Sequence, residues 1–147
     1  MRTRTFHFHA VASAVLVAAV PVAAWGLIGP LDEPGAPSEV SRAVEPPHFA
    51  EGLETTPGAV CLVLAVISGA VLVRASRRGT FERRWWPVLL PLVAAGLIAG
   101  VVGRVVTAAT IGANIGAGLS MSVGVPAILL LLIVAPVVRL SQRRARR

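Results

Sequence analysis

The stretch that decides the fold is residues 87–106, PVLLPLVAAGLIAGVVGRVV, which carries a single charge, Arg104. An α-helix rises about 1.5 Å per residue, so a run of this length covers about 30 Å, the thickness of the hydrocarbon layer of a bilayer. The pair Trp85 and Trp86 comes directly before it, and tryptophan is enriched at membrane–water interfaces. We therefore predict that residues 87–106 form a transmembrane helix.

Three further apolar runs extend this interpretation to the whole chain. Residues 8–28 and 119–138 contain no Asp, Glu, Lys or Arg, and residues 57–75 carry only Arg74 near their end. Charged residues make up 14% of the chain and its mean hydropathy is +0.76, whereas an ordinary soluble domain has about 25% charged residues. The predicted fold class is an all-α membrane protein, with residues 1–147 forming one four-helix transmembrane bundle.

The segments between these runs differ in charge, and the difference predicts their sides of the membrane. Residues 31–56 hold six of the seven acidic residues, several prolines and one arginine, which predicts a long acidic aqueous loop with little structure of its own. Residues 1–7, 74–84 and 139–147 hold 12 of the 14 arginines. By the positive-inside rule, both termini, the arginine loop 76–84 and the basic tail are expected in the cytoplasm, with the acidic loop outside the cell membrane.

Two boundaries have alternatives. Arg2 and Arg4, the apolar run after them and the small residues at 22–24 also fit a cleaved signal peptide, which would leave three helices. The apolar run continues to Ile28, which favours a retained first helix. Residues 107–118 are rich in small side chains and are compatible with a loop, a re-entrant segment or a continuation of the third helix.

Arg104 is the first candidate functional residue, because a charge at membrane depth is costly and commonly has a role. Three interpretations are compatible with the sequence. The side chain extends to the aqueous surface, or it pairs with Glu51 or Glu54 of the acidic loop, or it binds a ligand or ion.

Small residues predict where helices approach each other closely. Gly96 and Gly100 form one G-x-x-x-G pattern, and Gly112 and Gly116 form a second. Such spacing allows helix backbones to come close, and packing of this kind is a main attraction between helices in lipid. We expect Gly96 and Gly100 to mark a packing face inside the bundle rather than a dimer interface.

Polar and aromatic residues near the ends of the helices form two further candidate sets. The first is a polar cluster that is either a solvated turn or a set of hydrogen bonds between helices: Thr107, Thr110, Asn114, Ser120 and Ser122. The second is a set of tryptophans expected as interfacial anchors: Trp25, Trp85 and Trp86.

No residue pattern predicts catalysis, a metal site or a cofactor. Cys61 is the single cysteine, so an intrachain disulfide and a cysteine-rich zinc site are excluded. His7 and His9 lack a third ligand on a fixed scaffold. The arginine-rich segments lie beside the predicted spans and contain no aromatic stacking platform, so we expect contacts with anionic lipid at the cytoplasmic face and not with nucleic acid.

Three function classes follow from these observations. The first is a non-catalytic accessory, assembly or scaffold subunit that acts through helix–helix contacts, with a membrane protein partner or as a homo-oligomer. The alternative is a small oligomeric transporter or channel, in which Arg104 would serve anions. The third, an intramembrane enzyme, lacks a base beside any serine within the spans.

Overall fold

Four long helices dominate the computed structural model, which describes residues 2–29, 31–32, 41–45, 55–110 and 113–144. The helices are α1 (Arg2–Ile28), α2 (Thr56–Arg77), α3 (Trp86–Thr107) and α4 (Ala113–Arg144). A short 3-10 helix, η1 (Arg83–Trp85), precedes α3, and the two-residue strands β1 (Ser41–Arg42) and β2 (Ala109–Thr110) pair in antiparallel orientation. Each of the four helices is long and apolar enough to cross a membrane, as the sequence predicts.

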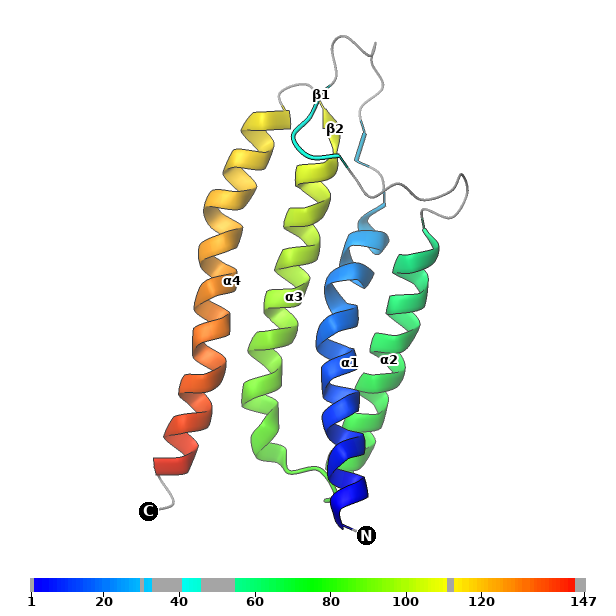
Figure 1. The fold of residues 1–147 in the computed structure, drawn as a ribbon, viewed down its shortest axis with the longest axis vertical. Helices are drawn as coiled ribbons and strands as arrows, with labels where there is room; N and C mark the ends of the chain where they lie inside the picture. Colours follow the sequence, from blue (N-terminus) through cyan, green and yellow to red (C-terminus); the bar gives the residue numbers. More distant parts are fainter. Residues whose placement is uncertain (1, 30, 33–40, 46–54, 111–112, 145–147) are drawn as a thin grey trace.

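The helices stand side by side in the order α2, α1, α3, α4 (Figure 1). α1 packs against both α2 and α3, and α4 packs against α3, so α2 and α4 lie at opposite edges of the row. This arrangement is more open than the bundle that the sequence suggests. An open arrangement is compatible with a chain that spans a bilayer, because lipid tails are as apolar as leucine and an apolar helix face gains little by being covered with protein.

The two ends of the row differ in composition. The start of α1, the α2–α3 loop and the end of α4 lie together at one end, which we call the arginine end (Figure 1). β1 and β2 lie at the other end, which we call the strand end. The arginine-rich segments that are far apart in the sequence are thus brought to the same end of the molecule.

Two helices begin earlier than their hydropathy predicts. α1 begins at Arg2 rather than at residue 8. The residues before the apolar run include Arg2 and Arg4, and arginine favours the helical conformation. α4 begins at Ala113 rather than at residue 119. Ala113 and Ala117, one turn apart, are both buried. Residues 113–118 are therefore the first turns of α4, and β2 lies in the short connection from α3.

The main hydrophobic core lies towards the arginine end, where α1, α2 and α3 meet. Leu72 of α2 is fully buried there. The other buried members of this cluster are Leu16, Val20, Ala75, Phe81 and Leu89. Phe81 belongs to the α2–α3 loop, and its ring meets those of His9 and Trp86 edge to face, with centroids 5.6 and 6.3 Å away. An aromatic side chain of the loop thus closes the end of the three-helix core.

Glycines make the closest contacts between helices. A Cβ atom on Gly100 would lie 2.4 Å from the carbonyl oxygen of Pro21 and 2.6 Å from Cβ of Ala24, and one on Gly96 would lie 3.2 Å from side-chain atoms of Val20 and Pro21. These two glycines therefore form the α3 surface that packs on α1. On α4, a Cβ atom on Gly116 would meet nothing within 4 Å, and Gly112 lies outside the described residues.

Candidate functional site

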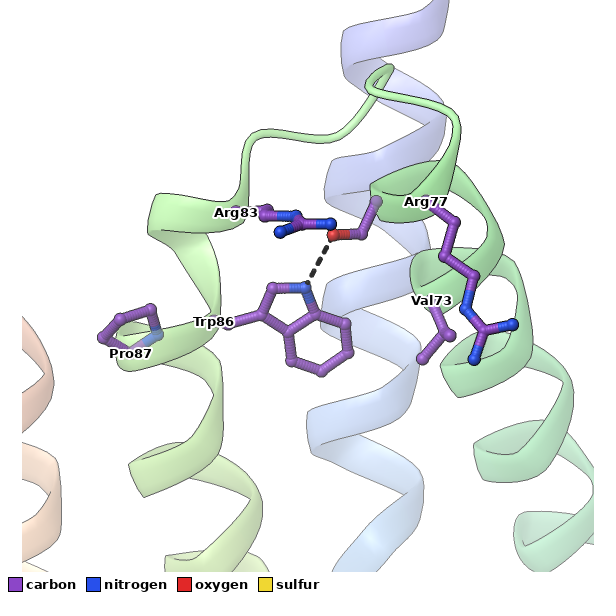
Figure 2. A pocket seen from close by; sticks show the side chains of 6 residues that line it. Val73, Arg77, Arg83, Trp86 and Pro87 are labelled. Atoms are coloured by element: carbon purple, nitrogen blue, oxygen red, sulfur yellow. Dashed lines mark hydrogen bonds between the residues drawn. The ribbon is translucent and has the colours of Figure 1, made fainter.

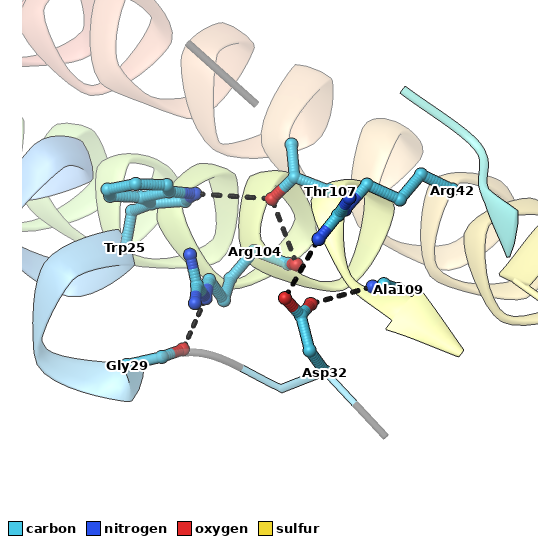
Figure 3. A network of polar contacts seen from close by, with 7 residues as sticks. All are labelled: Trp25, Gly29, Asp32, Arg42, Arg104, Thr107 and Ala109. Atoms are coloured by element: carbon cyan, nitrogen blue, oxygen red, sulfur yellow. Dashed lines mark hydrogen bonds and ion pairs between the residues drawn. The ribbon is translucent and has the colours of Figure 1, made fainter. Parts of the chain in front are cut away.

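Arg104 lies in the last turn of α3 and is half-buried between the ends of two helices. Its Nε donates a hydrogen bond to the carbonyl oxygen of Gly29, directly after the end of α1 (Figure 3). Its guanidinium carbon lies 4.8 Å from the centroid of the Trp25 ring. A cation is favoured both at the carbonyl end of a helix and over an indole face. The charge of Arg104 is therefore stabilised by α1.

Trp25 and Thr107 connect the same two helices beside Arg104. The indole Nε1 of Trp25 donates to Oγ1 of Thr107 over 3.4 Å. The Thr107 hydroxyl in turn donates to the carbonyl oxygens of Gly103 and Arg104, at 2.9 and 3.2 Å. Trp25 thus contacts α3 through its polar edge and Arg104 through its ring face, so it connects two helices.

Asp32 ties the segment after α1 to the strand end of α3. Its Oδ1 accepts a 2.8 Å hydrogen bond from the backbone N–H of Ala109, and its Oδ2 accepts a 3.0 Å bond from Nη2 of Arg42 (Figure 3). Arg42 also pairs with Ala109 in the register of β1 and β2, and the N–H of Val44 donates to the carbonyl oxygen of Val106. We call Asp32, Arg42 and Ala109 the latch, because they hold three separate segments together.

The electrostatics of the latch favour an ionised Asp32. The Ala109 N–H is the main influence that holds the pKa of Asp32 below its ordinary value of 3.8. Arg42 lowers this pKa through its hydrogen bond and its charge, Arg104 lowers it through charge alone, and partial burial opposes them. A carboxyl whose pKa is lowered on folding contributes its full stabilisation above the unfolded pKa, and this contribution is lost as the pH falls through the lower pKa of the folded state.

Replacing Asp32 should therefore release the latch without unfolding the helices. We expect Asp32→Ala to destabilise the strand pairing by about 1 kcal/mol, the usual net contribution of one hydrogen bond, and so to speed amide exchange about fivefold. Hydrogen exchange of the Val44 and Ala109 amides in detergent measures this. The unmodified chain should show the same loss of protection, after correction for the intrinsic exchange rate, as the pH falls through the lowered pKa of Asp32. Glu82→Ala removes an equal charge at the arginine end of the row and should leave exchange at the strand end unchanged; equal effects of the two variants would contradict the latch.

The predicted polar cluster does not gather at one place. Thr107 joins the contacts around Arg104, and Thr110 lies in β2. Ser120 and Ser122 donate to carbonyl oxygens of their own helix, those of Ala117 and Leu119, and Asn114 is exposed in the first turn of α4. The two serines therefore satisfy their own hydroxyls and build no pocket with Thr107.

Four residues of the site did not emerge from the sequence: Gly29, Asp32, Arg42 and Ala109. The sequence interpretation sought a partner for Arg104 at Glu51 and Glu54, which lie outside the described residues. Within the described part of the chain, Arg104 meets a backbone carbonyl, which no side-chain pattern reveals. The available signal was weak: Arg42 is the single base of the acidic loop, and Asp32 is the first acid after the first apolar run.

The tryptophans at the arginine end also make protein contacts. Arg139 of α4 places its guanidinium carbon 3.9 Å from the ring centroid of Trp85. Trp86 donates from Nε1 to Oγ of Ser76 over 3.2 Å. These contacts fasten the start of α3 to α4 on one side and to α2 on the other.

The groups at the strand-end site attach separate segments of the chain to one another. The side chains that meet there are an arginine pair, a carboxylate, an indole and a hydroxyl. Among the described residues, no three His, Cys, Asp or Glu side chains are grouped so that they could hold a metal ion. The chain matches no protein family, no curated protein and no solved structure. Its function therefore has to be inferred from its own geometry.

Proposed function

We propose that this chain is a small multi-pass cell-membrane protein that acts as a non-catalytic accessory, assembly or scaffold subunit. Its partner would be a larger membrane protein, bound through helix–helix contacts. The observation that carries the proposal is the single row of helices, in which α4 packs mainly on α3 within the described part of the chain. A helix at the edge of such a row has most of its circumference available to another transmembrane helix.

The strand-end part of α4 has the side chains that close helix packing requires. A Cβ atom on Gly116 or Gly118 would meet nothing within 4 Å, so these glycines are not used for packing within the described chain. Small residues of this kind allow a second backbone to approach closely and gain dispersion contacts that lipid supplies less well. The apolar side chains around them, Ile115 and Leu119, are strongly exposed. We assign the partner helix to this surface.

The contacts of Arg104 support a protein that acts through helix–helix contacts more than they support an anion transporter. Arg104, the residue on which anion movement would depend, is held by Trp25 and the Gly29 carbonyl. Conduction needs groups that bind an ion weakly along a continuous path. A row of helices encloses no such path by itself, so transport would require an oligomer with the arginine released from α1.

Orientation is part of the same proposal. The α2–α3 loop, the start of α1 and the end of α4 share one end of the row, and these segments hold most of the arginines. The positive-inside rule favours the cytoplasm for this end and the outer surface for the strand end. The cytoplasmic leaflet is the anionic one, so the arginines would also contact anionic lipid there.

The native complex tests the proposed function. A tagged chain carrying a photo-crosslinking residue in place of Gly118 would be extracted gently from its own membrane and sized. We expect one membrane protein partner at constant stoichiometry, crosslinked from position 118, and lost in Gly116→Leu. The matched control places the crosslinker at Val66, an exposed position of α2, where no crosslink is expected. Isolation as a monomer, or as a homo-oligomer whose anion flux in liposomes is lost in Arg104→Gln, would overturn the proposal.

A further inference from the structure

An open groove lies between the end of α2 and the start of α3, at the arginine end of the row (Figure 2). Its volume is about 440 Å³. Its walls combine apolar and cationic side chains: Val73, Ser76, Arg77, Arg83, Trp86 and Pro87. A groove of this composition can hold a ligand that has both an anionic and an apolar part.

Trp86 determines the shape of the groove. Its indole Nε1 donates to Oγ of Ser76, which orients the ring between α3 and α2. The ring also meets that of Phe81 of the buried core in a T-shaped contact. The indole is therefore held from two sides, and it gives the groove a rigid apolar wall that does not depend on a ligand.

The two arginines of the groove are available for an anion. Both side chains are exposed, and Figure 2 shows Arg83 extending above the Trp86 ring and Arg77 on the flank of α2 beside Val73. The acid of this loop, Glu82, forms its ion pair with Arg84 instead. Residues 74–84 contain five arginines and one glutamate, so the surroundings of the groove are strongly cationic.

The position of the groove favours a lipid over a soluble anion. It lies where two apolar helices end, which is the depth of the headgroups if the chain spans a bilayer. Guanidinium groups match phosphate oxygens in geometry and charge, and the apolar walls at Val73 and Pro87 continue into the exposed apolar faces of α2 and α3. A free phosphate would contact the arginines alone, whereas a phospholipid would contact both the arginines and the apolar walls of the groove.

We propose that this groove is a discrete site for one anionic glycerophospholipid. Its phosphate pairs with Arg77 and Arg83, and its first acyl carbons pack against Val73, Trp86 and Pro87. The site depends on the membrane placement proposed above but not on a partner protein. A bound lipid would link the end of α2 to the start of α3 and so support the α2–α3 contact.

Quenching of Trp86 fluorescence by brominated lipid tests the site. The chain would carry Trp25→Phe and Trp85→Phe, which keep an aromatic face under Arg104 and Arg139. It would be reconstituted in phosphatidylcholine with a small fraction of phosphatidylglycerol. In one sample the phosphatidylglycerol is brominated in its acyl chains, and in a parallel sample the phosphatidylcholine is. Each arginine beside an anionic lipid contributes about a fivefold preference. We expect phosphatidylglycerol to be preferred at Trp86, and Arg77→Gln/Arg83→Gln to remove most of this preference.

A charge-matched variant separates a site from general surface attraction. Arg74→Gln/Arg78→Gln removes two arginines of the same loop that do not line the groove, and it should keep the preference. Equal loss in both double variants, or full displacement of the lipid by excess inorganic phosphate, would overturn the proposal. Native mass spectrometry of the chain with all three tryptophans provides a second measurement: one retained phosphatidylglycerol is expected, and none after Arg77→Gln/Arg83→Gln. Because the purified chain is used, failure here leaves the proposed partner protein untouched.

Discussion

Gly100→Ala is expected to lower the free energy of unfolding by about 2 kcal/mol, although it adds only one methyl group. The added Cβ atom would lie 2.4 Å from the Pro21 carbonyl oxygen and 2.6 Å from Cβ of Ala24. Both atoms belong to or directly adjoin the backbone of α1, so neither can rotate away. The two helices would have to separate, and the contacts of Trp25 with Thr107 and Arg104 would weaken with them. Unfolding of the chain in mixed micelles with increasing denaturing detergent measures the effect.

Two further glycines make this prediction specific. Gly96→Ala should cost less than Gly100→Ala, because its nearest neighbours, at 3.2 Å, are side-chain atoms of Val20 and Pro21. Gly118→Ala meets nothing within 4 Å, so it should be neutral or stabilise α4 by up to about 1 kcal/mol through helix propensity. If all three variants behave alike, the close packing of α3 on α1 is not what holds the row together.

Phe81→Ala should have the largest effect of any single truncation, about 3 kcal/mol or more, at the low end of what a buried phenylalanine contributes in a core. Phe81 is 7% exposed, although it lies in a loop of arginines. Its ring meets His9 of α1 and Trp86 of α3, and its backbone N–H donates to the carbonyl oxygen of Ala75 in α2. Removing the ring would leave a cavity where three helices meet.

The matched control for Phe81 is Phe8, which is 58% exposed on α1. Phe8→Ala removes the same atoms from a site without core contacts and should change stability by less than about 0.5 kcal/mol. Phe81→Leu keeps most of the volume and should fall between the two. Near-ultraviolet circular dichroism should change with Phe81→Ala as the neighbouring Trp86 becomes mobile. Equal destabilisation by Phe8→Ala and Phe81→Ala would show that the loop does not close the core.

The latch and the groove lie at opposite ends of the row and use the same residue types differently. At the strand end, Arg104 and Arg42 are engaged by Trp25 and Asp32 of the same chain. At the arginine end, Arg77 and Arg83 line an open groove, while Arg84 and Arg139 are engaged by Glu82 and Trp85. Residue type alone therefore does not distinguish an arginine that fastens helices from one that is available to a ligand.

The four helices follow from the sequence because hydropathy is a local property. The hydropathy of each apolar run is enough to predict a helix there. A helix satisfies its backbone hydrogen bonds within the run, so no contact with a distant segment is needed for the prediction. The approach of Gly96 and Gly100 to another helix is suggested in the same way, since residues four apart share one helix face. That the other helix is α1, at Pro21 and Ala24, appears only in the structure.

The sequence by itself determined the number of apolar helices, their approximate positions and the charge difference between their ends, because these depend on composition along single segments. Only the tertiary structure decided the order of the helices in the row, the burial of Phe81 and the Gly29 carbonyl as the partner of Arg104. It also decided which of the five arginines in residues 74–84 line the groove, namely Arg77 and Arg83. These depend on packing between segments far apart in the chain. In lipid the hydrophobic effect does not select among such packings, so side-chain shape and a few polar contacts decide.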